Sequence, residues 1–280
     1  MILVIGSKGT LGSEFVRQLG SEAVGWDFED IDITKPEEIG KIIDLSPELI
    51  INCAAYNAVD KAGEECDKAM KLNGYAVGLL AKTGRYLGVP VVHYSTDFVF
   101  DGKRFSGYTE DAKPEPISFY GVSKYLGEKM LQANTDKFYL IRLTGLFGKS
   151  GSGKKCFVDA RIADSRIKDE LTIVYDEYTS PTYAPDLARR TLEIIFNKYP
   201  YGIYHGQNEG IASWYEFTRK IFEICGIKSD VVPVPGASLI RPAKRPKYPI
   251  LINTRLPRAR SYEEALSEYL RENGFINHNS

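Results

Sequence analysis

Three glycines in the spacing G-x-x-G-x-x-G follow the first apolar run of the chain and constrain its fold more than any other feature. The run is residues 1–5, and the glycines are Gly6, Gly9 and Gly12. Such a run is typical of a buried parallel strand, and the apolar repeat beginning at Phe15 indicates a helix after the turn. In a dinucleotide-binding unit, the first glycine permits the tight turn, the second lets backbone N–H groups approach a pyrophosphate, and the third lets helix and strand pack closely. The segment predicts a dinucleotide site, with an ordinary tight α/β connection as the alternative.

A second expected strand, at 23–26, ends at an acid that fits the adenosine ribose. Asp27 lies about 15 residues beyond the last glycine. An acid at this point bonds the ribose hydroxyls and repels a 2′-phosphate. No Arg or Lys lies between Val24 and Thr34, so we expect NADH to be favoured over NADPH. Lys8 leaves NADPH as an alternative, because a cation in the turn can attract the 2′-phosphate. A solvated lysine at a loop tip is at least as good an interpretation of this residue.

Apolar runs and helical patterns alternate through the first half of the chain. The runs predict strands at 1–5, 23–26, 49–53, 89–94 and 138–143. The helical patterns lie at 10–20, 36–45, 65–88 and 118–134. Such alternation is typical of a parallel sheet covered by helices. We therefore predict an α/β fold, a doubly wound parallel sheet (Rossmann) with a smaller C-terminal substrate lobe. A further run at 171–174 is a candidate to extend the sheet.

The pattern changes from about residue 145, where glycine, serine and lysine precede short elements, prolines and aromatics. We predict a dinucleotide-binding domain at 1–145 and a substrate-binding lobe at 146–280. Candidate helices of the lobe lie at 156–168, 184–198, 213–225 and 260–273. The helix at 184–198 is expected to pack back on the first domain, so the two parts interleave. Residues 277–280 are expected to be frayed.

The composition excludes several classes of protein. The chain has 36 Lys or Arg and 37 Asp or Glu, a net charge of −1, and so lacks the basic excess of a general nucleic-acid binder. No apolar run approaches the roughly 20 residues of a membrane span, and the first strand begins at Met1 without room for a signal peptide. We expect a cytoplasmic protein without a membrane partner. We also expect free thiols and no protein-built zinc site, because no C-x-x-C pair or histidine cluster joins Cys53, Cys66, Cys156, Cys225, His93, His205 and His278.

Tyr120 and Lys124 suggest what a bound dinucleotide is used for. They lie four residues apart in the helix predicted at 118–134, which places both on one face. An ammonium group beside the phenol would lower the pKa of the tyrosine, which could then act as an acid or base near neutral pH. Among 18 tyrosines the pattern also arises by chance on solvated helix faces, so it depends on the other motifs.

A hydroxyl group is expected at the end of the strand predicted at 89–94. Ser95 and Thr96 follow that strand, at the sheet edge where open α/β folds bind ligands. Either hydroxyl, together with Tyr120, can hold a carbonyl oxygen from two sides while a hydride arrives from a nicotinamide. The alternative is that the segment only caps a helix or turn.

Taken together, these segments resemble the extended short-chain dehydrogenases, and within them the dTDP-4-dehydrorhamnose reductase family. The glycine spacing is typical of the former. The resemblance runs over nearly the whole chain, and its most specific segments are 52–62 (NCAAYNAVDKA) and 94–102 (YSTDFVFDG). Other matching segments are 120–124, 180–182, 202–205 and 245–247.

The resemblance implies a reductase that uses NAD(P)H on the 4-keto group of a 4-keto-6-deoxyhexose nucleotide. It implies that Thr96, Tyr120 and Lys124 are catalytic and that the last two also contact the cofactor. Asp97 would contact the sugar, and the other implied substrate positions are Phe98, Gly145 and Arg245. The cofactor positions are Gly6, Gly9, Thr10, Leu11, Gly12, Asp27, Asp32, Ile33, Ala55 and Asn57.

Departures from the family pattern fall on the substrate side. The family usually has tyrosine at Phe98, tryptophan at Gly145, and R-P-x-N-S where this chain has RPKYP at 245–249. The nucleotide and sugar are therefore open. Dehydration is disfavoured, because Phe98 replaces the second acid of the Asp-Glu pair that dehydratases carry. Mg²⁺, which some members use at a dimer contact, also stays open, as does the choice between monomer and homodimer.

A different class of protein is the alternative. The superfamily includes a regulatory subunit of methionine adenosyltransferase, which keeps the dinucleotide fold and serves a partner enzyme. The changes at Gly145 and Tyr248 motivate a binding role of this kind. Against it stands the complete set of Thr96, Tyr120 and Lys124, which a purely structural subunit has little physical reason to keep.

Overall fold

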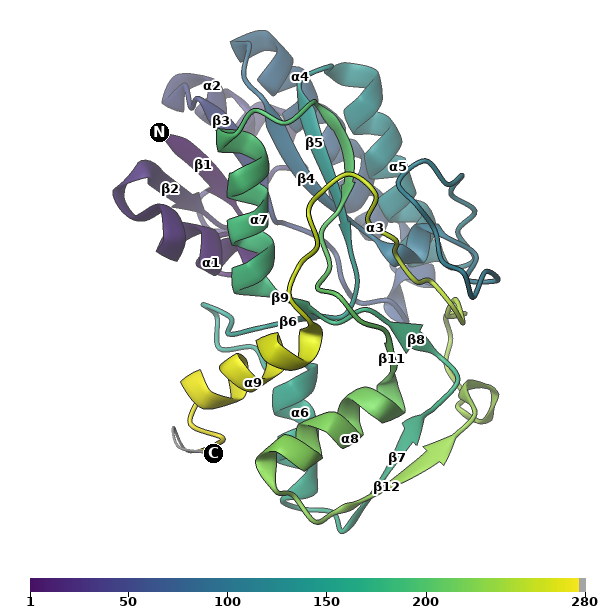
Figure 1. The fold of residues 1–280 in the computed structure, drawn as a ribbon. Helices are drawn as coiled ribbons and strands as arrows, with labels where there is room; N and C mark the ends of the chain where they lie inside the picture. The colour runs from purple at the N-terminus through teal and green to yellow at the C-terminus, as the bar shows by residue number, and fades with distance from the viewer. Residues whose placement is uncertain (277–280) are drawn as a thin grey trace.

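A parallel sheet of six strands forms the centre of the larger part of the molecule (Figure 1). The computed structural model describes residues 1–276, so the fraying predicted at 277–280 lies outside the described residues. The strands lie in the order β10-β5-β4-β3-β1-β2, and every neighbouring pair is parallel. Their bounds are β1 Ile2–Ile5, β2 Ala23–Trp26, β3 Leu49–Asn52, β4 Val91–Thr96, β5 Phe138–Leu143 and β10 Gly202–His205. The α/β fold class and the five predicted strands are confirmed.

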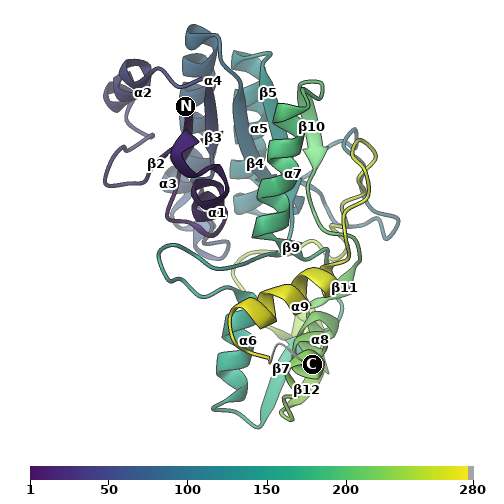
Figure 2. The same cartoon turned by 60° about the vertical axis from the view of Figure 1, so that its left-hand side comes forward.

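Helices cover both faces of this sheet (Figure 2). Ile2 and Val4 of β1 pack in the apolar core with α1 and α7, whereas Leu3 and Ile5 pack in the core with α2, α4 and α5. Burial on both faces explains why the strands are unbroken apolar runs in the sequence. Helix α7 also packs against α1. The bounds are α1 Thr10–Leu19, α2 Gly40–Leu45, α4 Ala76–Leu87, α5 Phe119–Asn134 and α7 Ala184–Phe196.

Two predicted helices are divided. The segment predicted at 36–45 forms a 3₁₀ turn, Pro36–Glu38, and then α2. The segment predicted at 65–88 forms α3 (Cys66–Met70), a π-helical turn (Lys71–Tyr75) and α4. Within the π turn, the Asn73 amide bonds the main-chain N and O of Tyr56, at 2.8 and 3.0 Å. The turn thereby holds the loop that follows β3, in keeping with the frequent occurrence of π turns beside functional sites.

The smaller, C-terminal part has its own apolar core, built around Phe147, Tyr183, Phe217 and Tyr269. Its helices are α6 Phe157–Ser165, α8 Trp214–Cys225 and α9 Tyr262–Glu272. Its strands are β6 Leu146–Phe147, β7 Glu170–Val174, β8 Tyr178–Thr179, β9 Thr182–Tyr183, β11 Ala212–Ser213 and β12 Asp230–Val234. It also has a 3₁₀ turn, Gly236–Ser238, and the larger part has further ones at Gly20–Glu22, Lys61–Gly63 and Asp97–Val99.

The prediction that the run at 171–174 could extend the central sheet is wrong. This run belongs to β7, which pairs in parallel with β12 in a separate two-stranded sheet. The position beside β5 is instead filled by β10, which follows α7 in the chain. The segment Gly202–His205 matches the family motif, but the sequence analysis did not predict it as a sheet strand. Its partner strand, β5, ends 59 residues earlier, at Leu143, so no local pattern connects the two. Among residues 1–276, no helix has the combined length and apolar character needed to cross a bilayer.

Candidate active site

A cavity of about 1070 Å³ lies between the carboxyl edge of the central sheet and the C-terminal part. From β1 the chain adds β2 on one side and then β3, β4, β5 and β10 on the other. Such a switch point in the strand order is where doubly wound sheets bind ligands. Of the predicted site residues, Gly12 alone does not line the cavity. Those that do are Gly6, Gly9, Thr10, Leu11, Asp27, Asp32, Ile33, Ala55, Asn57, Thr96, Asp97, Phe98, Tyr120, Lys124, Gly145 and Arg245.

The glycine turn has the geometry expected from its spacing. Gly6 adopts φ of 75°, and a Cβ there would lie 2.7 Å from the main-chain N of Ala54. A Cβ on Gly12 would clash with the main-chain O of Gly6, so the turn leaves no room for a side chain at this position. Helix α1 begins at Thr10, and its N-cap residue, Gly9, makes no side-chain cap. The first N–H groups of α1 therefore suit a phosphate.

Asp27 stands at the end of β2 beside this turn. Its Oδ2 accepts a hydrogen bond of 2.8 Å from the main-chain N of Lys8, and its Oδ1 accepts one of 2.9 Å from the main-chain N of Phe28. The Lys8 ammonium group is paired with Glu29 at 3.0 Å. The Asp27 carboxylate is thus held in place at the cavity wall. Lys8, the residue that could attract a 2′-phosphate, is paired with an acid instead.

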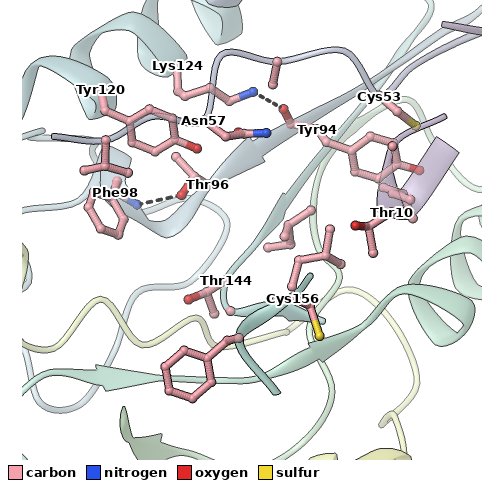
Figure 3. Close-up of a pocket in the computed structure, with 18 of the residues that line it drawn as sticks. Thr10, Cys53, Asn57, Tyr94, Thr96, Phe98, Tyr120, Lys124, Thr144 and Cys156 are labelled. Carbon is pink, nitrogen blue, oxygen red and sulfur yellow. Dashed lines mark hydrogen bonds between the residues drawn. The ribbon is translucent and has the colours of Figure 1, made fainter. Parts of the chain in front are cut away.

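Tyr120 and Lys124 lie on α5, and both are buried, with Tyr120 facing the space beside Thr96 (Figure 3). The Lys124 ammonium group donates a hydrogen bond of 2.6 Å to the main-chain O of Tyr94. Burial lowers the pKa of Lys124 to about 8. Burial, and then the nearby Asp97 carboxylate, raise the pKa of Tyr120 above its usual value. The prediction that Lys124 lowers the pKa of Tyr120 is therefore wrong for the chain alone, because the cost of desolvating the phenolate dominates.

Thr96 combines the two interpretations of the strand-end hydroxyl. Its Oγ1 accepts a hydrogen bond of 3.2 Å from the main-chain N of Phe98, which caps the short 3₁₀ turn after β4. Thr96 also lines the cavity and donates a hydrogen bond of 2.8 Å to Asp97 Oδ1. Ser95 lines the cavity too, but its buried Oγ has no hydrogen-bond partner among the described residues.

Two substrate-side departures have a local explanation in the structure. Gly145 has φ of 54°, and a Cβ there would lie 2.6 Å from Thr179 Oγ1, so a larger side chain would be strained at this position. Phe98 packs edge-on against Tyr120 with ring centroids 5.6 Å apart. A hydroxyl on residue 98 is therefore not needed to order the Tyr120 ring.

Arg245 is bound by a protein group in this structure. Its guanidinium forms two hydrogen bonds of 2.6 Å with the carboxylate of Asp60. The following residues bring Tyr248 into an aromatic cluster with Phe105 and Tyr178 at centroid distances of 5.3 and 5.4 Å. The segment 241–250, hereafter the strap, is thus anchored to the loop after β3 and to β8.

Several cavity residues were missed by sequence reasoning. Thr144 and Thr179 are buried hydroxyl residues, and Arg241 makes a two-point ion pair with Glu177. The glycine-rich segment 148–155 lies against the turn at Lys8, whose main-chain O accepts hydrogen bonds from it. Of these features, only segment 148–155 was visible in the sequence, as a change in composition. The other contacts join residues from different elements.

No metal centre is evident: across residues 1–276, no three His, Cys, Asp or Glu side chains are grouped so that they could hold an ion. All four cysteines are free thiols.

A doubly wound parallel sheet, a glycine turn, an acid at the end of β2 and a buried Tyr-x-x-x-Lys pair facing one cavity together define the extended short-chain dehydrogenase class. Residues 1–274 match the model of the RmlD substrate binding domain family, and the chain belongs to this family. The chain is 35% identical to the spore coat polysaccharide biosynthesis protein SpsK of Bacillus subtilis, over 97% of each protein.

Solved structures agree with this assignment. A dTDP-4-dehydrorhamnose reductase from Clostridium acetobutylicum is 38% identical, with a TM-score of 0.91 over 96% of this chain and 98% of that one. The dTDP-4-dehydrorhamnose reductase of Bacillus anthracis, solved in complex with NADP, is 33% identical, with a TM-score of 0.93 over 97% of this chain and 98% of that one. The predicted family is confirmed.

Proposed function

We propose that the protein is an NAD(P)H-dependent reductase of the 4-keto group of a 4-keto-6-deoxyhexose nucleotide, with dTDP-4-dehydrorhamnose as the leading substrate. The observation that carries this proposal is the shared cavity: the hydroxyls of Thr96 and Tyr120 face the same space that the glycine turn reaches from β1. The choice of sugar nucleotide follows the names of the two reductases that are similar to this chain in sequence and fold.

The roles of the side chains follow from their chemistry. When bound, the reduced nicotinamide supplies a hydride to the carbonyl carbon. Tyr120 gives its proton to the carbonyl oxygen, so the ketone becomes an alcohol, and the tyrosinate recovers a proton from solvent. Lys124 stands one helical turn from Tyr120, where its ammonium can bind the nicotinamide ribose. Burial raises the pKa of Tyr120, so the phenol keeps its proton until the oxygen develops negative charge.

For the cofactor, we propose that NADH is favoured over NADPH. Asp27 is fixed at the cavity wall, where a 2′-phosphate would meet its charge. One relative was solved in complex with NADP, so the two dinucleotides must be compared directly. Mg²⁺ is left as an addition to the assay rather than assigned a site.

We divide the chain at about residue 145 into a cofactor domain and a substrate lobe, with α7 returning to the cofactor domain. The packing of α7 on α1 supports this interleaved division. We assign the reaction to the cytoplasm, where reduced nicotinamides and sugar nucleotides are both available. The protein acts as a monomer or a homodimer.

The regulatory-subunit alternative has no comparable support. None of the three relatives named above is described as a regulatory subunit. The two changes that motivated it have local packing roles: Gly145 leaves room for Thr179, and Tyr248 packs with Phe105 and Tyr178.

The test is oxidation of NADH and of NADPH with 4-keto-6-deoxyhexose nucleotides that carry thymidine, uridine, cytidine or guanosine diphosphate. Turnover with one of them, and most of all with the thymidine compound, supports the reductase. Tight dinucleotide binding without turnover on any of the four would contradict it.

A further inference from the structure

Four buried side chains beside the active-site cavity form one continuous series of hydrogen bonds. Thr179 Oγ1 lies 2.8 Å from Thr144 Oγ1. Thr144 Oγ1 donates to Asp97 Oδ2 at 2.7 Å, and Thr96 Oγ1 donates to Asp97 Oδ1 at 2.8 Å. None of the four residues is more than 7% exposed. They come from β4, from the turn after it, from the segment after β5 and from β8, so the series exists only in the folded protein.

Gly145 makes room for this series. A Cβ on Gly145 would lie 2.6 Å from Thr179 Oγ1, the atom that contacts Thr144. A side chain at this position would push Thr179 aside and interrupt the series. The absence of a side chain at residue 145 therefore allows Thr179 and Thr144 to stay in contact.

The protonation state of Asp97 decides what Thr96 offers to a substrate. When Asp97 is a carboxylate, the hydroxyl proton of Thr96 points to Oδ1, and Thr96 presents only a lone pair to the cavity. A ketone oxygen is an acceptor and gains nothing from a lone pair. When Asp97 carries a proton on Oδ1, it donates to Thr96, and the Thr96 proton is free to point at the ketone oxygen.

The surroundings of Asp97 permit this change. The titratable side chain facing it is the Tyr120 phenol on α5, while Thr144 and Thr179 face it with neutral hydroxyls. Burial raises the pKa of Asp97 to about 6, although the hydrogen bonds from Thr144 and Thr96 lower it. Both protonation states are therefore accessible near neutral pH. A bound substrate removes further water and favours the neutral acid.

We propose that Asp97 is a positioning residue whose protonated form completes a one-directional donor series, from Thr179 through Thr144 and Asp97 to Thr96, and so aims the Thr96 hydroxyl at the ketone oxygen. The inference rests on the proposed reductase function. Thr144 and Thr179 are then positioning residues as well, because they act only through Asp97.

The first test is the pH profile of kcat/KM with the sugar nucleotide on which the enzyme turns over. The wild-type value is expected to fall as the pH rises through the pKa of Asp97. In Asp97→Asn, the amide Nδ2 donates to Thr96 at every pH and Oδ1 still accepts from Thr144, so this fall should disappear. In Thr144→Val, the carboxylate loses a donor, and the fall should move up by about one pH unit. Thr83→Val, which removes a buried hydroxyl bonded to Leu79 on α4, is the matched control.

The second test does not require turnover. Carboxyl ¹³C NMR of aspartate-labelled protein, with Asp97→Asn for assignment, gives the titration of Asp97 directly. The proposal expects this titration to move upward in Thr144→Val and not in Thr83→Val. It is overturned if the titration does not move, if Asp97→Asn retains the wild-type fall in kcat/KM, or if that variant is inactive throughout while folded. Absence of turnover in the wild type, with the expected NMR shift, contradicts the reductase function and leaves the hydrogen-bond series standing.

Discussion

Arg245 and Asp60, 185 residues apart, form a two-point ion pair that ties the strap to the loop after β3, with both N–O distances at 2.6 Å. The Arg245 side chain is 17% exposed and that of Asp60 is 42% exposed, so solvent screens the pair only partly. Paired nitrogens and oxygens in this geometry add directional strength to an ion pair. Because Arg245, Pro246 and Pro249 of the strap line the cavity, the pair fixes part of the cavity wall.

Loss of this pair should weaken substrate binding. We expect Asp60→Ala to raise KM for the sugar nucleotide about fivefold, since a pair of this kind contributes about 1 kcal/mol, and to change kcat less. Arg245→Met should have a similar effect, and the double variant should be no worse than either single one. Glu115→Gln, which removes an exposed carboxylate paired with Lys113, is the control. A much larger loss in Arg245→Met than in Asp60→Ala would mean that Arg245 binds the substrate directly.

Asp27 should set the preference between the two dinucleotides. Asp27→Asn removes a charge that would repel a 2′-phosphate, and a repulsion of about 1 kcal/mol corresponds to roughly fivefold in binding. The ratio of kcat/KM for NADH to that for NADPH should therefore fall about fivefold. Asp44→Asn, on the exposed side of α2, should leave the ratio unchanged. An unchanged ratio in Asp27→Asn would remove this residue from the ribose site.

Lys124 should lower stability at neutral pH. Burial lowers its pKa from 10.5 to about 8, so the folded state binds fewer protons than the unfolded state between these values, and stability rises with pH across this range. Relative to Lys124→Met, the wild-type free energy of unfolding should gain roughly 2–3 kcal/mol between pH 7 and pH 10. Urea unfolding at several pH values measures this difference. Lys82→Met, which removes an exposed lysine from α4, controls for the lost charge, and a flat difference for Lys124→Met would contradict the burial argument.

The parts of the site that the sequence predicts are those encoded over short distances. The glycine turn and the Tyr-x-x-x-Lys pair each lie within one element or one turn, so residue type and spacing suffice to identify them. The bond from Lys124 to the main-chain O of Tyr94 and the contact of Thr179 with Thr144 join separate elements, and no local pattern marks them. The same holds for β10, whose place in the sheet depends on where α7 returns the chain. The raised pKa of Tyr120 was missed because burial, not the neighbouring charge, dominates it.

The central claim is that Tyr120 supplies the proton when the ketone is reduced. The most direct measurement is the rate at which the bound reduced cofactor is oxidised in a single turnover by Tyr120→Phe. The control is Tyr204→Phe, which removes from the edge strand β10 a hydroxyl that donates to the main-chain O of Pro200. We predict that Tyr120→Phe slows hydride transfer by about 100-fold or more, as loss of a general acid does, while cofactor affinity stays within about twofold. Tyr204→Phe should retain the wild-type rate. Hydride transfer at the wild-type rate in Tyr120→Phe would contradict the account.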